Sequence, residues 1–344
     1  MRQSMDVEVS NAVRSKRLVL FGETLQFYNY PDKEVLEELT GMLPLKFTSS
    51  LLTEQDLAAQ AALRRPLVER DCRSSGEAEV DTKVWKQTIA ECERGWLHGP
   101  LKAEEVPVGA SISKRFGLRQ RHKIRLIDDF TESSVNQSVS VLESPTLHTV
   151  GIACAVLACW FRNSKALGCS SELQVRTFDL ASAYRQVGLC AGGRAVGFIR
   201  VYNPTTGQWA YFQAKVLPFG AVRSVHSFLR LARAIWWIGS VACLLTWSSF
   251  FDDYIVFSTP SLARSSDLTA AALFSLLGWE YATEGRKSVL FVQNAKPWES
   301  SLTLFQQVKV CALWPIRSLG SLTLLQSWNV LFWTVAFLNP MPSA

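Results

Sequence analysis

Residues 250–257 read Phe250-Phe-Asp-Asp-Tyr-Ile-Val-Phe257, and the interpretation of the chain begins with this stretch. Apolar residues on either side of Asp252-Asp253 predict two short strands, over Phe250 to Ser258, that turn at the two carboxylates. Ionised carboxylates among apolar and aromatic neighbours cost several kcal/mol unless a cation compensates them. The pair therefore indicates a cation site, although on its own it also fits an acidic hairpin turn in water.

A second carboxylate motif lies upstream, in Thr177-Phe-Asp-Leu-Ala-Ser-Ala-Tyr184. Here a strand predicted over Gln174 to Leu180 passes into a predicted helix start, and Asp179 stands at the sheet edge where ligands bind in many α/β folds. Alone, such an aspartate also fits a helix cap. Together the two motifs supply three carboxylates, the hard oxygen ligands that two Mg²⁺ ions about 3.5–4 Å apart require.

The surrounding pattern is mixed α/β. Val216-Leu-Pro-Phe-Gly220 is a turn that enters a predicted helix, and its glycine lets backbone approach a ligand closely. Thr149 to Phe161 is apolar throughout and fits either a buried helix or a buried strand. Other predicted elements are helices at 32–42, 53–69, 85–96, 222–238 and 267–277, a strand at 123–127, and a hairpin of 195–201 with 208–216.

The composition is that of an ordinary globular protein. The chain has 344 residues, of which 48% are hydrophobic and 19% charged, so it can bury a core. Its eight cysteines form no CxxC pair, which argues against a zinc site. The N-terminus resembles no signal peptide, so we expect reduced thiols and a cytoplasmic or nuclear location.

Positive charge is concentrated in one stretch. The net charge is +6, and no acid lies between Glu105 and Asp128. Runs of cations without anions indicate a polyanion partner, although a solvated basic loop is the alternative. The cations concerned are Lys114, Arg115, Arg119, Arg121, Lys123 and Arg125.

Four motifs in this order resemble the palm of a reverse transcriptase from a retrotransposon, of the long-terminal-repeat or tyrosine-recombinase type. They are residues 178–186 (FDLASAYRQ), the ribbon ending in 216–220 (VLPFG), 250–258 (FFDDYIVFS) and Leu276 to Phe291. Lys123 to Phe130 with Asn136 is similar to the fingers strand of that family. The resemblance covers roughly residues 85–295.

The resemblance implies an α+β fold with a polymerase palm, an antiparallel sheet with helices, next to a fingers region. The implied divisions are a helical N-terminal region (1–76), a fingers-like region (77–178), the palm (179–295) and an uncharged, atypical tail (296–344). Because the tail is unlike the continuation that the resemblance implies, we expect the thumb to be absent or degenerate.

The implied activity is RNA-directed DNA synthesis, in which a nucleotidyltransferase uses an RNA template, a DNA primer and deoxynucleoside triphosphates. Asp179, Asp252 and Asp253 would be catalytic and bind two Mg²⁺ ions, or Mn²⁺. One ion would activate the 3′-hydroxyl, and the other would neutralise the triphosphate and the leaving pyrophosphate.

The resemblance also implies a nucleotide pocket. Tyr184 would be the steric gate under the sugar, Phe219 and Gly220 would border the nucleotide, and Lys287 would lie near the pyrophosphate as a general acid. Lys123 and Arg125 would contact the triphosphate, and Gln186 and Arg223 would support the pocket. Nucleic acid would contact the basic residues Lys114, Arg115, Arg119 and Arg121.

Some features depart from the family pattern. Phe250-Phe251 replaces a tyrosine plus a small or aliphatic residue, and Val222 to His226 replaces a segment with small residues and proline. Ser318 to Ala344 is uncharged and long enough to span a bilayer, although its polar residues argue against a membrane partner. Two alternatives remain: a catalytically defective retroelement relic that binds nucleic acid, and a membrane-associated protein. The sequence predicts no protein partner.

Overall fold

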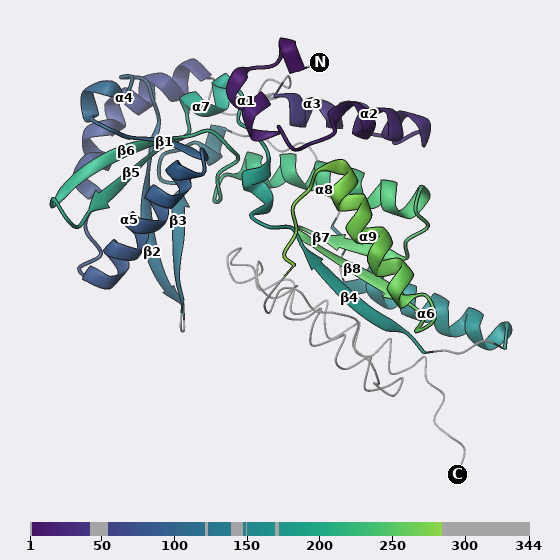
Figure 1. The fold of residues 1–344 in the computed structure, drawn as a ribbon. Helices are drawn as coiled ribbons and strands as arrows, with labels where there is room; N and C mark the ends of the chain where they lie inside the picture. Colours follow the sequence, from purple (N-terminus) through teal and green to yellow (C-terminus); the bar gives the residue numbers. More distant parts are fainter. Residues whose placement is uncertain are drawn as a thin grey trace. The chain divides into compact units, whose positions relative to one another are not determined.

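Helices and two β-sheets make up the part of the chain that the structure, a computed structural model, describes (Figure 1). The α+β class predicted from the sequence is therefore confirmed. The described residues are 2–41, 54–120, 123–138, 147–148, 150–168 and 172–283. The chain divides into one unit of residues 1–147 with 174–291 and another of residues 148–173 with 292–344. The predicted tail, residues 296–344, lies outside the described ranges.

An antiparallel sheet of three strands, in the order β4-β8-β7, carries both aspartate motifs. Phe178 pairs with Tyr254 across β4 and β8, and both side chains are fully buried. Burying two large aromatic side chains in one cross-strand pair holds the register, because a slip by one residue would turn them to the other face. The strands are β4 (Gln174–Asp179), β7 (Trp247–Phe250) and β8 (Asp253–Ser258).

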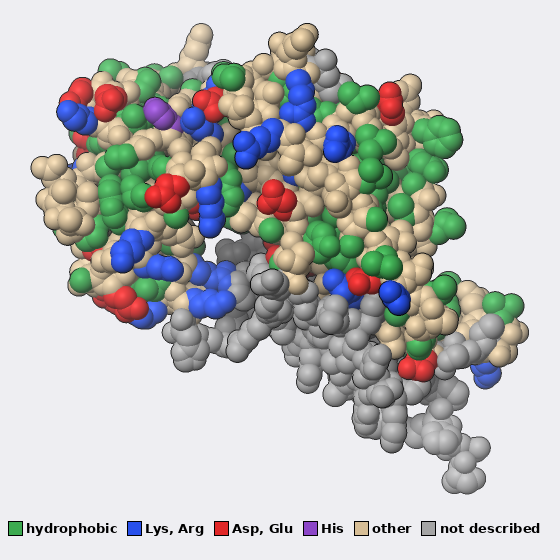
Figure 2. Space-filling view, viewed as in Figure 1, with side chains coloured by type: hydrophobic (Ala, Val, Ile, Leu, Met, Phe, Trp, Pro, Cys, Tyr) green, Lys and Arg blue, Asp and Glu red, His purple; other side chains and the backbone are tan. Residues whose placement is uncertain are grey.

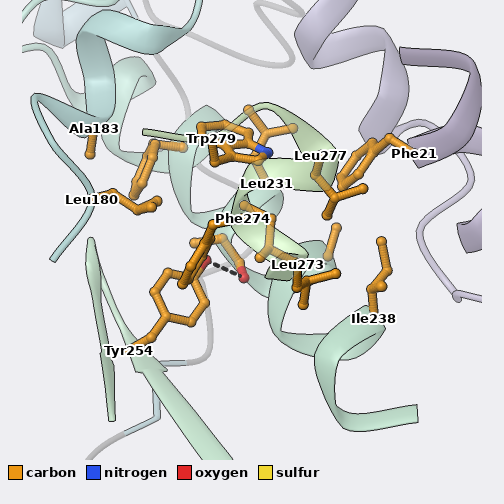
Figure 3. Packing of buried hydrophobic residues seen from close by; sticks show 14 of the residues in the cluster. Phe21, Leu180, Ala183, Leu231, Ile238, Tyr254, Leu273, Phe274, Leu277 and Trp279 are labelled. Atoms are coloured by element: carbon orange, nitrogen blue, oxygen red, sulfur yellow. Dashed lines mark hydrogen bonds between the residues drawn. The ribbon is translucent and has the colours of Figure 1, made fainter. Parts of the chain in front are cut away.

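Two helices, α8 (Val222–Val241) and α9 (Ala263–Leu277), pack against this sheet. Phe274 of α9 lies 5.1 Å from Tyr254, measured between ring centroids. The Tyr254 hydroxyl donates a hydrogen bond of 2.9 Å to the Ala232 carbonyl of α8, which satisfies a polar group that is otherwise buried (Figure 3). Both helices were predicted, and both are longer than the predicted ranges.

A second sheet of five strands has the order β1-β6-β5-β2-β3, with β2 and β5 parallel and the other neighbours antiparallel. Helix α5 (Ala78–Glu93) covers one face. Gly117 permits this approach, because a Cβ atom there would lie 2.5 Å from the Val80 side chain. The strands are β1 (Leu97–Leu101), β2 (Ile112–Gln120), β3 (Lys123–Asp129), β5 (Phe198–Asn203) and β6 (Gln208–Ala214), so the predicted hairpin is confirmed.

The N-terminal region belongs to the same hydrophobic core as the three-stranded sheet. Its buried side chains, such as Phe21, pack in one cluster with Leu231 of α8, Leu277 of α9 and Trp279 (Figure 3). Its helices are α1 (Val7–Ala12), α2 (Leu18–Phe27) and α3 (Val35–Thr40), followed after an undescribed stretch by α4 (Glu54–Asp71). The predicted boundary at residue 76 therefore falls inside the first unit.

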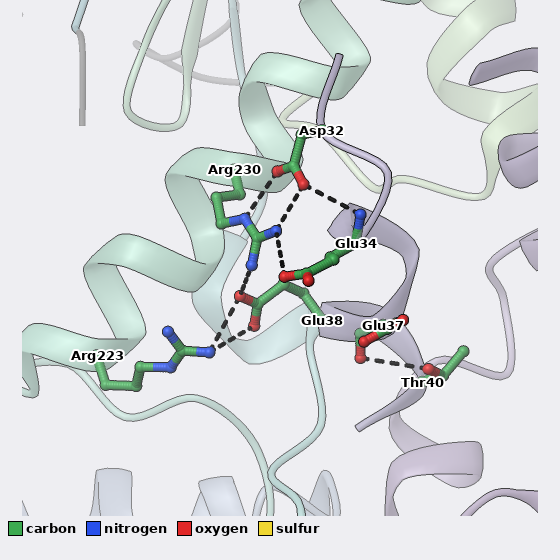
Figure 4. Close-up of polar contacts among 7 residues, drawn as sticks. All are labelled: Asp32, Glu34, Glu37, Glu38, Thr40, Arg223 and Arg230. Atoms are coloured by element: carbon green, nitrogen blue, oxygen red, sulfur yellow. Dashed lines mark hydrogen bonds and ion pairs between the residues drawn. The ribbon is translucent and has the colours of Figure 1, made fainter. Parts of the chain in front are cut away.

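Ion pairs also attach the N-terminal region to α8 (Figure 4). Arg230 donates to both carboxylate oxygens of Asp32, at 2.8 and 2.6 Å, and to Glu38 at 2.7 Å. Arg223 donates to the same Glu38 carboxylate at 3.1 Å. Glu38 is buried, so two guanidinium groups compensate one desolvated carboxylate. Arg223 and Arg230 of α8 therefore both hold the N-terminal region through Glu38.

The structure refines two local predictions. The helix start predicted directly after Leu180 is a short 3-10 helix, η4 (Ala183–Gln186), because Ser182 adopts a left-handed conformation with φ of 51°. The apolar segment that fitted helix or strand is helical, α6 (Val150–Ala166), and belongs to the second unit. Among the described helices, none is long and apolar enough to cross a bilayer.

One buried lysine links the N-terminal region to the three-stranded sheet unit. The Lys16 ammonium group donates to Gln186 Oε1 at 2.6 Å and to the Gly278 carbonyl at 2.8 Å. It also lies 4.2 Å from the centroid of a Trp279 ring. Burial lowers the pKa of Lys16 from 10.5 to about 7, and the charge of Glu280 opposes this shift.

We predict that Lys16 makes stability depend on pH. Between pH 7 and 10.5 the unfolded chain binds more protons at this lysine than the folded protein does, so the free energy of unfolding should rise with pH across that window. In Lys16→Met this contribution, a few kcal/mol at most, should vanish. Urea unfolding of both proteins at several pH values measures it, and parallel pH profiles would contradict the assignment.

Candidate functional site

Strand pairing brings the two aspartate motifs together. Asp179, the last residue of β4, is the direct cross-strand partner of Asp253, the first residue of β8. The Leu180 amide donates a hydrogen bond of 2.9 Å to the Asp252 carbonyl. Asp179 is buried, whereas Asp252 and Asp253 are partly exposed. Residue 179 therefore lies beside residues 252 and 253 with no element between them, as a shared site requires.

The turn between β7 and β8 has an unusual backbone. Because Phe250 pairs with Asp253, the two turn residues are Phe251 and Asp252, one position earlier than predicted. Phe251 adopts a left-handed φ of 53°. Glycine or asparagine normally occupies such a position, and a bulky side chain there marks a strained turn. Strain of this kind persists where the surrounding structure enforces it, and it clusters at functional sites.

The donor set fits a divalent cation in its chemistry. Three carboxylates supply the oxygen ligands that Mg²⁺ prefers, and two of them stand on directly paired residues. Within the described ranges, however, no three His, Cys, Asp or Glu side chains lie close enough to form a metal site. The fit is thus one of donor type and backbone placement, without a completed coordination geometry.

Aromatic rings form the next layer of the site. Tyr184 of η4 is buried, and its ring lies 4.8 Å from Phe219 and 4.8 Å from Phe228, measured between centroids. Burial raises the pKa of Tyr184, and the negative charge of Asp252 raises it further. Phe219 is 46% exposed, so part of its ring faces solvent, and the ring of Tyr184 packs against it.

Asn136 joins the Pro-Phe-Gly turn to helix α8. Its Nδ2 donates to the Gly220 carbonyl at 2.9 Å, and its Oδ1 accepts from the Val222 amide at 2.9 Å. Gly220 has a φ of 90°, and a Cβ atom there would lie 2.2 Å from the Asp128 carbonyl oxygen. Only glycine fits this contact. The Pro-Phe-Gly turn therefore packs directly against the backbone at the end of β3.

A buried network of charges crosses from the five-stranded sheet to η4. Arg115 donates to both Asp128 oxygens, at 2.6 and 2.9 Å, and to Glu91 at 2.9 Å. Arg185, the neighbour of Tyr184, donates to the same Glu91 oxygen at 3.1 Å. Glu91 and Arg185 were not singled out from the sequence, because a lone acid on a helix and a lone arginine after a motif carry no signal there.

This network corrects one nucleic-acid assignment. The Arg115 side chain is 1% exposed, and its donors serve Asp128, Glu91 and Thr88 inside the fold. Two carboxylates already compensate its charge, so it is a structural residue rather than a surface contact for phosphates.

Other cations of the basic stretch also have acidic partners. Lys114 pairs with Glu132 at 2.5 Å, and the exposed Arg119 pairs at 2.8 Å each with Glu77, directly before α5, and Glu79 in its first turn. On the face drawn in Figure 2, acidic side chains lie among the Lys and Arg side chains. The stretch lacks acids in sequence, but α5 and the loop after β3 supply them. Arg121 and Lys287 lie outside the described residues.

Lys123 and Arg125 lie on the face of the β2–β3 hairpin that α5 leaves uncovered. They pair with Gln120 and Leu118, whereas Gly117 and Arg119 on the alternate face meet α5. Lys123 is exposed, and Arg125 is partly buried, which lowers the pKa of Arg125. Both side chains therefore stand on one face of the same strand.

No protein-family model and no curated protein matches this chain.

We predict that Arg115→Met lowers the free energy of unfolding by about 3–5 kcal/mol, because Asp128 would remain buried without a cation. Urea unfolding measures this loss. Arg119→Gln is the matched control, since it removes an arginine from the same strand whose ion pairs are exposed to solvent, and its stability should equal that of the wild type. Equal losses in the two variants would contradict a structural role specific to Arg115.

Proposed function

We propose that this protein catalyses template-directed nucleotidyl transfer, as an RNA-directed DNA polymerase. The observation that carries the proposal is the pairing of Asp179 with Asp253 beside the strained turn that holds Asp252. In this proposal the three-stranded sheet with α8 and α9 is the palm, and the five-stranded sheet with α5 belongs to the fingers.

The aspartates would hold the metal ions of the reaction. Asp179, Asp252 and Asp253 are the residues proposed to bind two Mg²⁺, or Mn²⁺. When bound, such ions supply charge neutralisation at the triphosphate and a lowered pKa at the attacking 3′-hydroxyl. The partial burial of the site supports this role, because electrostatic stabilisation is stronger where water is excluded.

The aromatic layer would select the sugar. Tyr184 is wedged between Phe219 and Phe228, so its ring has little freedom to withdraw from a 2′-hydroxyl. The exposed ring of Phe219 and the glycine backbone at 220 would border the nucleotide. Burial is the main cause of the raised pKa of Tyr184, and the charge of Asp252 adds to it, which supports placing the sugar near both residues.

Cations would contact the polyanionic substrates. Lys123 and Arg125 share the hairpin face opposite α5 and are the proposed triphosphate contacts. Lys114 and Arg119 remain proposed nucleic-acid contacts, because exposed ion pairs contribute little and phosphates can displace their carboxylates. Arg121, as a nucleic-acid contact, and Lys287, near the pyrophosphate, are proposed from the sequence alone.

A primer-extension assay tests the proposal. The full chain should extend an oligo(dT) primer on poly(rA) with Mg²⁺, and Asp252→Asn should abolish extension, because the amide loses the charge needed to bind the cation. Asp71→Asn, on an exposed carboxylate of α4, is the matched control and should keep full activity. Equal product from the wild type and Asp252→Asn would refute the metal assignment. Template binding without extension would favour a non-enzymatic relic.

A second prediction concerns sugar selection. Tyr184→Ala should raise the incorporation of ribonucleotides relative to deoxynucleotides by roughly tenfold or more, because the ring no longer obstructs the 2′-hydroxyl. Tyr184→Phe keeps the ring and should leave the ratio unchanged. Competition between labelled ribo- and deoxynucleotides measures it, and an unchanged ratio in Tyr184→Ala would exclude the gate.

A further inference from the structure

The side chain of Gln186 organises the backbone next to the aspartates. Its Nε2 donates to the carbonyls of Ala181 and Glu280, each at 2.8 Å. Its Oε1 accepts from the Glu280 amide at 3.0 Å and from Lys16 Nζ at 2.6 Å. Since two acceptors face the NH₂ and two donors face the oxygen, only one amide orientation satisfies all four bonds.

The segment that Gln186 holds pairs with the end of β4. The Ala181 amide donates to the Glu280 carbonyl at 2.9 Å, and the Ala282 amide donates to the Asp179 carbonyl at 2.8 Å. An antiparallel bridge between Leu180 and Tyr281 lies between these bonds. Asp179 therefore has β8 on one side and residues 280–282 on the other, so its backbone is fixed from both edges.

Lys16 is the contact through which the N-terminal region reaches this segment. It is 3% exposed, and its ammonium group bonds Gln186 and the Gly278 carbonyl. The flanking residues reinforce the contact: Ser15 donates to the same carbonyl, and the Arg17 amide donates to the Leu277 carbonyl. A buried amine must have hydrogen-bond partners, so methionine would be the less costly residue here if apolar packing were sufficient.

We infer that Lys16 is a positioning residue that, through Gln186 and the 280–282 segment, holds Asp179 in place opposite Asp253. The inference rests on the proposed function only for the role of the aspartates. Another N-terminal anchor, the pair of Asp6 with Arg194 at 2.7 Å, ends on helix α7 (Ala191–Ala195) and not on this segment. Variants at these two contacts therefore distinguish docking of the N-terminal region from positioning of Asp179.

Amide hydrogen exchange of the full chain tests the inference. Lys16→Met should speed exchange at Leu180, Ala181 and Ala282 by about tenfold or more, and leave Phe212 in the five-stranded sheet unchanged. Asp6→Asn, the matched control, should leave all of these amides unchanged. In the primer-extension assay, Lys16→Met should lower kcat about tenfold or more at unchanged KM for the nucleotide, whereas Asp6→Asn should alter neither.

A second variant tests the inference if Lys16→Met does not fold. Gln186→Glu keeps an acceptor for Lys16 but loses both donations to the Ala181 and Glu280 carbonyls, so it should speed exchange at the same three amides. The inference would be overturned if a folded Lys16→Met showed unchanged exchange at these amides. If Lys16→Met does not fold, unchanged exchange in Gln186→Glu would overturn it. Equal increases in Lys16→Met and Asp6→Asn would also overturn it. Absence of extension by the wild type would overturn the proposed function alone, because exchange still reports the positioning.

Discussion

The pairing of β4 with β8 is the constraint on which the candidate site depends. Side chains alternate along a strand, so a slip of one residue would place Phe178 opposite Asp253 and turn Asp179 away. The buried pair of Phe178 and Tyr254 prevents such a slip, because both rings pack against Phe274. Aromatic packing one residue inside the sheet thus determines where the carboxylates stand.

Polar contacts, here called joints, connect this sheet to the rest of the first unit. Glu91 of α5 accepts from Arg115 of the five-stranded sheet and from Arg185 of η4, and Asn136 holds the turn before α8. Each joint is buried or lies beside the aromatic layer. Desolvated charges that pair with one another tolerate little displacement, so these contacts give the parts of the site a defined spacing.

Periodicity and turn chemistry predicted most elements of the fold. The hairpin of β5 and β6 was recognisable because Asn203 to Gly207 carries turn residues between alternating runs. The 3-10 geometry at η4 was not, because it depends on the left-handed conformation of Ser182 and on contacts of Gln186 with residues 280 and 16. A local pattern contains no record of such remote partners.

The charges show most clearly what the sequence by itself determined. It identified three aspartates in two motifs and a basic stretch, since these are properties of residue type and spacing. Tertiary structure decided which charges are compensated: Arg115 is buried with Asp128 and Glu91, and Arg119 pairs with acids at the N-terminus of α5. It also decided that Lys16 reaches Gln186, because burial and partner distance arise only when segments far apart in the chain pack together.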